Sequence, residues 1–243
     1  MNGIAPDAVE LTPALDAVDW SRVERELEDT GHSVLAELLP RCACEALAAL
    51  YTSDRAFRSQ VVMARHGYGR GEYKYFDYPL PPLVAALRER LYARLAPIAN
   101  RWSEALRSAA VYPAALSDYL ALCRGAGQGR ATPLVLRYGA GDYNRLHQDV
   151  YGELWFPLQV AVLLSSPQRD FSGGEFVLTE QRARTQARAS VVPLRQGDAV
   201  AFAVRHRPER GARWFRRVTM KHGVSTVRAG ERFTLGVIFH DAT

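Results

Sequence analysis

The segment His147-Gln148-Asp149 constrains the fold most, because a histidine and an acid two residues apart can act together on an extended strand. Residues i and i+2 of a strand point to the same face, so His147 and Asp149 would turn inward while Gln148 turns away. Two histidines and one carboxylate form the facial ligand set of non-haem Fe(II) oxygenases. We therefore expect a second histidine from a distant segment to lie beside this strand.

His222 is the expected third ligand. The β-branched run at 223–227 predicts a strand that begins at this histidine. After a turn at 228–231, a second strand is expected over residues 232–239. Such a hairpin would bring Arg232 close to His222, so the pattern predicts a metal ligand and a cation in one site.

Two other histidines are less suitable. His206 lies between Arg205 and Arg207, whose charges would repel a metal cation. His240 is close to the end of the chain, where residues tend to fray. A lone His-x-Asp is weak evidence, and the combination with a distant histidine and arginine is much more specific.

Hydrophobic periodicity separates two kinds of segment. Residues 134–240 contain short apolar runs between Gly, Pro, Ser and Asp turns, which is typical of an all-β sandwich or barrel. Residues 8–51 and 83–124 are rich in Ala, Leu and Arg with helical spacing. In the second segment, the leucines with this spacing are Leu83, Leu87, Leu91 and Leu95. The pattern predicts an α+β chain.

Pro97 and Pro113 should interrupt the second helical segment. We expect residues 1–130 to form an N-terminal helical region whose Tyr/Gly-rich loop, at about 60–82, packs on the barrel. Residues 131–243 would then form the catalytic core.

Several segments follow one another in the order found in a known superfamily. They lie at residues 136–143, 158–165, 171–176 with its Gly-Gly-Glu turn, and 196–202 with its Gly-Asp-Ala strand. With the His-x-Asp, the chain from 134 to 241 resembles the Fe(II)- and 2-oxoglutarate-dependent dioxygenases, in particular their prolyl-hydroxylase-like branch. The whole-chain pattern resembles a bacterial oxygenase family linked to repair of alkylated DNA.

The resemblance implies a double-stranded β-helix, or jelly roll, braced by N-terminal helices. It also implies an enzyme that uses Fe(II), 2-oxoglutarate and dioxygen, and that releases succinate and carbon dioxide while it hydroxylates a C–H bond. The implied metal ligands and catalytic residues are His147, Asp149 and His222. The implied cosubstrate residues are Arg232, Thr234, Tyr138 and Gln159. Tyr138 could equally pack in the core, and Gln159 could make a structural hydrogen bond.

Two features depart from better-known branches. Many collagen-type prolyl hydroxylases have Lys where this chain has Arg232, and established alkylated-base demethylases carry a second downstream arginine that is absent after Arg232. The sequence does not choose between hydroxylation of protein or amino acids and oxidative N-demethylation of nucleic acid. A metal-binding jelly-roll sensor without turnover and a nucleic-acid-binding module are the alternatives.

The chain has a formal net charge of +5, carried largely by arginine. One cluster runs from Arg205 to Lys221 with Trp214 and Phe215 in its middle; a smaller one comprises Arg182, Arg184 and Arg188. Arginine and aromatic side chains beside a site can bind a phosphate backbone and stack on bases. The alternative for the larger cluster is a solvated loop with a compositional preference for arginine.

Residues 61–82 combine Gly67, Gly69 and Gly71 with four tyrosines. We interpret this stretch as a flexible lid over the substrate, or as an aromatic-anchored loop packed on the jelly roll.

Three cysteines, Cys42, Cys44 and Cys123, lack the number and spacing of a zinc site and are expected to be free thiols. No apolar run approaches the ~20 residues needed to cross a bilayer. Residues 1–16 lack the basic start of a secretory signal, so a cytoplasmic location and no membrane partner are expected.

Overall fold

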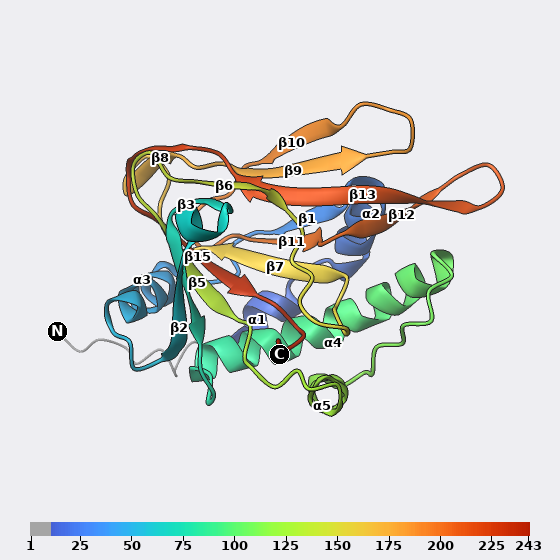
Figure 1. Cartoon of the computed structure of the whole chain (residues 1–243), viewed down its shortest axis with the longest axis horizontal. Helices are drawn as coiled ribbons and strands as arrows, with labels where there is room; N and C mark the ends of the chain where they lie inside the picture. Colours follow the sequence, from blue (N-terminus) through green and yellow to red (C-terminus); the bar gives the residue numbers. More distant parts are fainter. Residues whose placement is uncertain (1–10) are drawn as a thin grey trace.

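Two antiparallel sheets face each other in the computed structural model, which describes residues 11–243 (Figure 1). The larger sheet has seven strands in the order β1-β11-β7-β15-β5-β4-β2. Its strands are β1 His32–Leu35, β2 Phe57–Val62, β4 Glu72–Phe76, β5 Leu134–Tyr138, β7 Leu158–Leu163, β11 Ala199–Ala203 and β15 Arg232–Val237.

The smaller sheet follows the order β10-β9-β13-β6-β3, and β12 pairs with β13 outside this path. Its strands are β3 Gly69–Arg70, β6 Tyr143–His147, β9 Phe176–Gln181, β10 Arg188–Val192, β12 His206–Arg210 and β13 Phe215–Val224. A separate pair joins β8 Phe171–Gly173 to β14 Val227–Gly230. The expected β-rich region after residue 134 is therefore confirmed.

Helices cover the outer face of the larger sheet. The longest, α4 Pro82–Ala105, runs beneath the strands in Figure 1. The others are α1 Leu11–Asp16, α2 Trp20–Thr30, α3 Arg41–Ala49 and α5 Leu116–Gly125, with short 3-10 turns η2 Leu50–Thr52 and η3 Met63–His66. No helix of the described part of the chain is long and apolar enough to cross a membrane.

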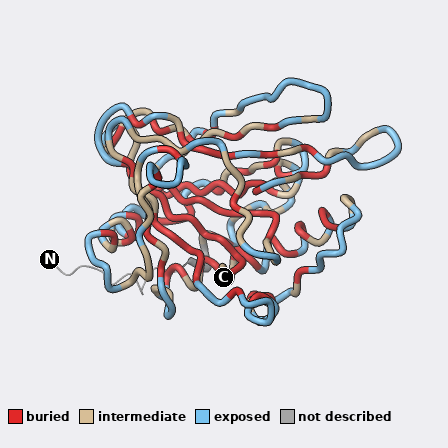
Figure 2. Tube along the Cα trace, in the orientation of Figure 1, coloured by how far each residue is buried: buried red, intermediate tan, exposed pale blue. Residues whose placement is uncertain are grey.

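Strand β7 shows how the core positions the site. All of its residues are buried, as expected for a strand covered on both faces. Side chains alternate along a strand, so Val160 and Val162 pack in the main core beside the helices while Gln159 and Ala161 line a cavity between the sheets. Figure 2 shows the buried strands concentrated at the centre of the molecule.

The helical predictions were partly wrong. Residues 32–35, inside the segment expected to be helical, form β1 and pair with β11. Pro97 does not interrupt α4, because it lies on the exposed face while Leu95, Ile98 and their neighbours are buried on both sides of it. Pro113 does lie in the break between α4 and α5, as predicted.

The predicted hairpin that would join His222 to Arg232 was also wrong. His222 lies near the end of β13 in the smaller sheet, whereas Arg232 begins β15 in the larger one. The intervening residues 227–230 form β14, which pairs with β8 instead of making a turn. The two side chains still reach one cavity, because the sheets that carry them face each other.

The end of the chain does not fray. Asp241 and Arg88 form an ion pair of 2.7 Å, and both side chains are 1% exposed. His240 is also buried, and its Nδ1 accepts a hydrogen bond from the Phe156 amide over 3.2 Å. The end of the chain is therefore ordered, so fraying was the wrong reason for rejecting His240 as a ligand. His240 nevertheless does not belong to the metal cluster.

The predicted free thiols are confirmed, since Cys42, Cys44 and Cys123 form no disulfide. The expected absence of a secretory signal in residues 1–16 falls largely on residues 1–10, which lie outside the described part of the chain.

Candidate metal and cosubstrate site

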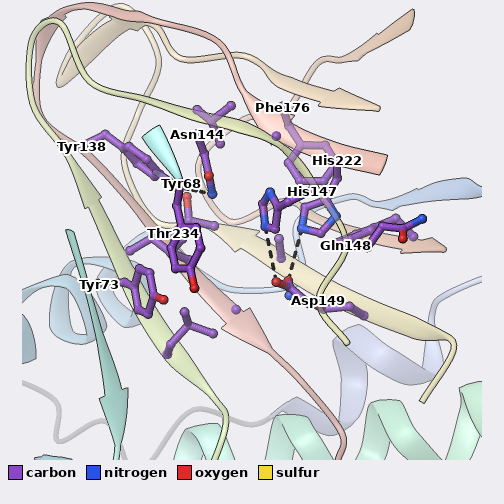
Figure 3. Close-up of a pocket in the computed structure, with 18 of the residues that line it drawn as sticks. Tyr68, Tyr73, Tyr138, Asn144, His147, Gln148, Asp149, Phe176, His222 and Thr234 are labelled. Carbon is purple, nitrogen blue, oxygen red and sulfur yellow. Dashed lines mark hydrogen bonds and ion pairs between the residues drawn. The ribbon is translucent and has the colours of Figure 1, made fainter. Parts of the chain in front are cut away.

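His147, Asp149 and His222 meet at one end of the space between the sheets (Figure 3). Their ligand atoms all lie within 4.8 Å of one another. Asp149 Oδ1 lies 3.3 Å from His147 Nε2, and Asp149 Oδ2 lies 3.2 Å from His222 Nε2. The structure thus brings together the three residues that the sequence predicted.

Strand pairing produces this arrangement. His222 on β13 is directly opposite His147 on β6, and the register shifts between His222 and Val224. On its other side β13 pairs with β9, so His222 is held from both flanks. Asp149 lies two residues beyond His147, the last residue of β6. Gln148 points away from the cluster in Figure 3. Its amide donates to the Met220 carbonyl over 2.8 Å.

The charges of the three side chains are coupled, and the ionised form of Asp149 and the neutral form of His222 suit a bound cation. Burial alone would raise the pKa of Asp149, but the two histidines outweigh it and hold this pKa well below its usual range. Burial, with repulsion from His147, lowers the pKa of His222. Burial works in the same direction on His147, but its hydrogen bond to Asp149 and the charge of that group raise its pKa overall.

The polar surroundings of the histidines fit a metal ion. His147 Nδ1 lies 2.7 Å from the Arg145 carbonyl, which leaves Nε2 toward Asp149. A backbone carbonyl on the remote ring nitrogen is the usual support of a metal-binding histidine. His222 Nδ1 is buried without a hydrogen-bond partner among the described residues. Nitrogen ligands and one carboxylate are a donor set that Fe(II) accepts.

Arg232 is the cation of the site, and it has no acidic partner within ion-pair distance in the described part of the chain. Its side chain is 2% exposed, and burial lowers its pKa to about 10. Arg232 Nη1 donates to Thr234 Oγ1 over 2.6 Å, while Nε has no partner. An isolated buried charge is costly, so this position is suited to a bound anion.

Gly174 leaves the room that Arg232 occupies. A side-chain carbon at Gly174 would lie 2.9 Å from Arg232 Cδ and 2.8 Å from Val227 Cγ2. Its φ of +63° is also a conformation that side chains rarely adopt. The second glycine of the Gly-Gly-Glu turn is therefore needed for two physical reasons: its backbone conformation and the space that Arg232 occupies.

The other predicted cosubstrate residues line the same cavity, whose volume is about 360 Å³. The Tyr138 hydroxyl accepts a hydrogen bond from the Asn144 amide over 3.2 Å, which leaves its proton available to a ligand. Gln159 Oε1 is buried without a hydrogen-bond partner among the described residues, so this oxygen is free to accept from a ligand. Thr234 lies beside Arg232, as two residues on one strand face should.

Sequence reasoning missed the tyrosines around Asp149. Tyr151 donates its hydroxyl to Asp149 Oδ1 over 2.7 Å, and Tyr73 lines the cavity from β4. Tyr151 follows the His-x-Asp by two residues, which is the signal that could have indicated it. Tyr73 is distant from Asp149 in the sequence and comes near it only when the chain folds.

A two-histidine, one-carboxylate cluster and a buried unpaired arginine, enclosed between two antiparallel sheets, define an oxygenase of the Fe(II)- and 2-oxoglutarate-dependent class. Residues 71–242 match the family Oxygenase-NA, described as an oxygenase catalysing oxidative methylation of damaged DNA. The chain belongs to this family, so the predicted enzyme class is confirmed.

Two curated relatives are uncharacterized proteins from two strains of Mycobacterium tuberculosis. Each is 48% identical over 167 residues, which cover 69% of this chain and 72% of the relative. The names of these relatives state no substrate.

Solved structures with low sequence identity share the fold. A Pseudomonas putida prolyl-4-hydroxylase matches with a TM-score of 0.54 and 17% identity, over 92% of this chain and 100% of the other. A Trichoplax adhaerens prolyl hydroxylase, solved in complex with a peptide fragment of the oxygen degradation domain of hypoxia inducible factor, matches with a TM-score of 0.52 and 13% identity, over 97% and 95%.

Proposed function

We propose that this oxygenase uses Fe(II), 2-oxoglutarate and dioxygen to remove alkyl groups from damaged nucleic acid. His147, Asp149 and His222 would hold the iron. Arg232 and Thr234 would bind the distal carboxylate of 2-oxoglutarate, with Tyr138 and Gln159 as further polar contacts. The observation that carries the proposal is Arg232, because its buried guanidinium lacks an anion that 2-oxoglutarate would supply.

The chemistry of the loaded site follows from its composition. Iron and 2-oxoglutarate together supply a two-electron oxidation by dioxygen: 2-oxoglutarate leaves as succinate and carbon dioxide, and one oxygen atom enters a substrate C–H bond. On an N-methyl group the product is N–CH₂OH, which splits into formaldehyde and N–H. The cavity walls, built from Leu134, Leu136, Phe176 and Phe202 among others, exclude water from this step.

We also propose that the two facing sheets form a double-stranded β-helix with a catalytic core at residues 131–243. Residues 1–130 would then brace it through helices and through β1 and β4, which pair with β11 and β5. The likeness in fold to prolyl hydroxylases supports this assignment.

The tyrosine- and glycine-rich segment would cover the substrate. Tyr68 is 48% exposed, lines the cavity and stacks on His66 with ring centroids 5.3 Å apart. Its carbonyl accepts a hydrogen bond from the Arg145 amide over 2.9 Å, which ties the segment to β6. Gly69 permits this close approach, because a side-chain carbon there would meet the Tyr143 carbonyl at 2.3 Å. Packing therefore explains Gly69 better than the flexibility that the sequence suggested.

An exposed aromatic ring at the mouth of the cavity suits a planar substrate. Stacking of a base on an aromatic side chain is worth ~1–3 kcal/mol and does not depend strongly on base identity. We infer that Tyr68 supports the damaged base while its alkyl group points toward the metal ligands.

The hairpin β12–β13 would bind the flanking phosphates. It projects from the body in Figure 1, and its tip carries Trp214, 69% exposed, with Arg107 stacked at 4.5 Å from the ring. A groove of about 900 Å³ beside the tip is also lined by Arg210, Arg213 and Arg217. Glu28, Asp29 and Glu104 line it as well, so the groove is basic but mixed.

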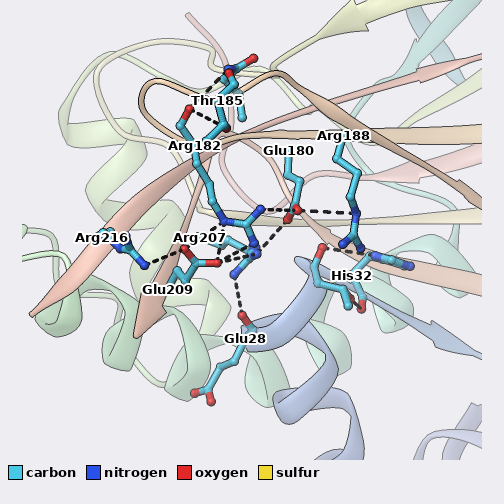
Figure 4. Close-up of polar contacts among 11 residues, drawn as sticks. Glu28, His32, Glu180, Arg182, Thr185, Arg188, Arg207, Glu209 and Arg216 are labelled. Atoms are coloured by element: carbon cyan, nitrogen blue, oxygen red, sulfur yellow. Dashed lines mark hydrogen bonds and ion pairs between the residues drawn. The ribbon is translucent and has the colours of Figure 1, made fainter. Parts of the chain in front are cut away.

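Ion pairs leave the arginine clusters with less free charge than the sequence suggested. Arg207 is 1% exposed and pairs with Glu180 over 2.8 Å, while Arg182 pairs with Glu209 over 2.7 Å (Figure 4). Arg216 also approaches Glu209, at 3.5 Å. The segment that could have been a solvated loop is therefore a β-hairpin. Its exposed arginines Arg210, Arg213 and Arg217, which line the groove, form no ion pair among the described residues and remain available to a nucleic acid.

The first test is anaerobic titration of Fe(II) and 2-oxoglutarate into the purified protein, monitored by the visible metal-to-ligand charge-transfer band. We expect a band that is lost in Arg232→Ala and retained in Arg228→Ala, whose side chain is exposed. No band in the unmodified protein would overturn the cofactor assignment.

The substrate test compares N-methylated single-stranded oligonucleotides with proline-containing peptides. Formaldehyde in proportion to succinate is expected with the oligonucleotides. Succinate formed in proportion to a hydroxylated peptide, without formaldehyde, would reject nucleic acid as the substrate.

A further inference from the structure

Three tyrosines, Tyr151, Tyr75 and Tyr73, form a row of side chains, and the first of them contacts the carboxylate of Asp149. Tyr151 donates to Asp149 Oδ1 over 2.7 Å. The Tyr75 hydroxyl is within hydrogen-bonding reach of Tyr151 on one side and Tyr73 on the other. The rings of Tyr73 and Tyr75 meet edge to face, with centroids 5.3 Å apart. The row therefore extends from a metal-ligating group to a wall of the cavity, which Tyr73 lines.

Hydrogen-bond chemistry favours one direction for the row, starting from the observed contact of Tyr151 with Asp149. An ionised carboxylate only accepts, so the single proton of Tyr151 is committed to Asp149. The Tyr151 oxygen can then accept from Tyr75, whose oxygen can accept from Tyr73. In a chain of this kind each hydroxyl would direct its proton toward Asp149, and such chains polarise and strengthen their members.

We infer that Tyr151, supported by Tyr75 and Tyr73, is a positioning residue that holds Asp149 in one orientation. This inference rests on the metal site of the proposed function. A carboxylate that binds a metal through both oxygens uses two coordination positions, whereas one that is tied to Tyr151 through Oδ1 uses one. The row would thereby keep open the positions that the cosubstrate and dioxygen need.

The row also connects the site to the segment around Tyr68. Tyr73 and Tyr75 lie on β4, which directly follows β3 and pairs with β5. Because Tyr73 and Tyr75 are on one face of β4, a single strand sets both hydroxyl positions. The placement of β4 on the sheet is therefore part of what orients Asp149.

The test is calorimetric titration of Co(II) into the metal-free protein, with the visible absorption of bound Co(II) as a second readout. We expect Tyr151→Phe to weaken Co(II) binding by about 10- to 100-fold and to change the absorption bands, because the carboxylate gains freedom. Tyr75→Phe should weaken binding by about 2- to 5-fold. The double variant should match Tyr151→Phe, since Tyr75 acts through Tyr151.

Tyr119→Phe is the matched control, because the Tyr119 hydroxyl is buried without a partner and should be dispensable for Co(II) binding. If the unmodified protein binds no Co(II), the metal site of the proposed function fails. If it binds Co(II) and Tyr151→Phe has the same affinity and absorption, the inference about the row alone is overturned. Full additivity of the two single substitutions would also overturn it, because the tyrosines would then act independently.

Discussion

Arg232 donates to the Thr234 hydroxyl over 2.6 Å, and no carboxylate neutralises its buried charge among the described residues. The protein therefore tolerates an uncompensated cation until an anion binds. Burial already lowers the pKa of Arg232 to about 10, which indicates how unfavourable the free charge is.

Arg232→Met should separate stability from binding. The ligand-free protein should gain about 1 kcal/mol or more in its free energy of unfolding, because an unpaired buried charge is removed. Its affinity for 2-oxoglutarate, measured by calorimetry with Mn(II) present, should fall about 100-fold. A large loss of stability without loss of affinity would contradict the role assigned to Arg232. Arg228→Met, on an exposed side chain, should change neither quantity.

Gly174→Ala should weaken cosubstrate binding through Arg232. The added carbon would crowd Arg232 Cδ at 2.9 Å, so the guanidinium must move. Gly141→Ala is the matched control, because Gly141 also has a positive φ, +85°, but no atom lies within 4 Å of the added carbon. Both variants should lose about 1 kcal/mol from backbone strain, and only Gly174→Ala should bind 2-oxoglutarate more weakly. Equal affinities in the two variants would reject the steric explanation.

His240 should make the protein sensitive to mild acid. Burial, with repulsion from Arg88, lowers its pKa from 6.5 to about 4. The unfolded chain therefore binds a proton between these values that the folded chain refuses, so stability is complete above pH ~6.5 and falls as the pH drops toward ~4. The loss is roughly 3 kcal/mol by linkage.

Urea denaturation across this pH range tests the prediction for His240. His240→Gln should flatten the pH dependence relative to the unmodified protein, while His66→Gln, on an exposed side chain, should leave it unchanged. Parallel curves for the unmodified protein and His240→Gln would show that His240 is not the sensitive group.

Removing one partner of the buried ion pair Arg88–Asp241 should lower the free energy of unfolding more than replacing both partners together. Arg88→Met or Asp241→Asn alone should lower the free energy of unfolding by about 3–5 kcal/mol, because one partner remains buried and unpaired. The double variant should lose less than the sum of the two single losses. The exposed pair Arg41–Glu45 should contribute about 1 kcal/mol or less in the same cycle. Strict additivity at Arg88 and Asp241 would mean that their contact is not coupled.

The tip of the β12–β13 hairpin should set the salt dependence of DNA binding. Replacing Arg210, Arg213 and Arg217 with Gln should reduce the slope of log affinity against log salt by about 2 for a single strand, because up to three phosphate contacts are lost. Fluorescence anisotropy over a range of salt concentrations measures this slope.

The control removes the same charge from a different part of the surface, at the exposed residues Arg41, Arg55 and Arg124. Its slope should match that of the unmodified protein. An equal reduction in both triple variants would show that net charge, and not the hairpin, governs the interaction.

The sequence predicted the local chemistry of the site better than its assembly. His147 and Asp149 were identified from strand periodicity, although β6 ends at His147 and Asp149 lies two residues beyond it. His222 was identified because its context suited a metal. Arg232 was assigned correctly to the same cavity but through a hairpin that does not exist. The partner of a strand depends on the whole sheet, so local sequence could not show that β14 would pair with β8.

The remaining errors have similar causes. Pro97 was expected to break a helix, yet its exposed position lets buried neighbours on both sides maintain α4. Arg207 was counted as surface charge, although its partner Glu180 lies on another strand. Tyr75 was not singled out for the site, because its hydroxyl reaches Tyr151 only after distant strands come together.

The pairing of His222 on β13 with His147 on β6 has a consequence for the lifetime of the loaded enzyme. An ion bound to both would tie together two strands from well-separated parts of the sequence. The bound ion would oppose separation of these strands, so metal binding should slow the opening of this portion of the smaller sheet.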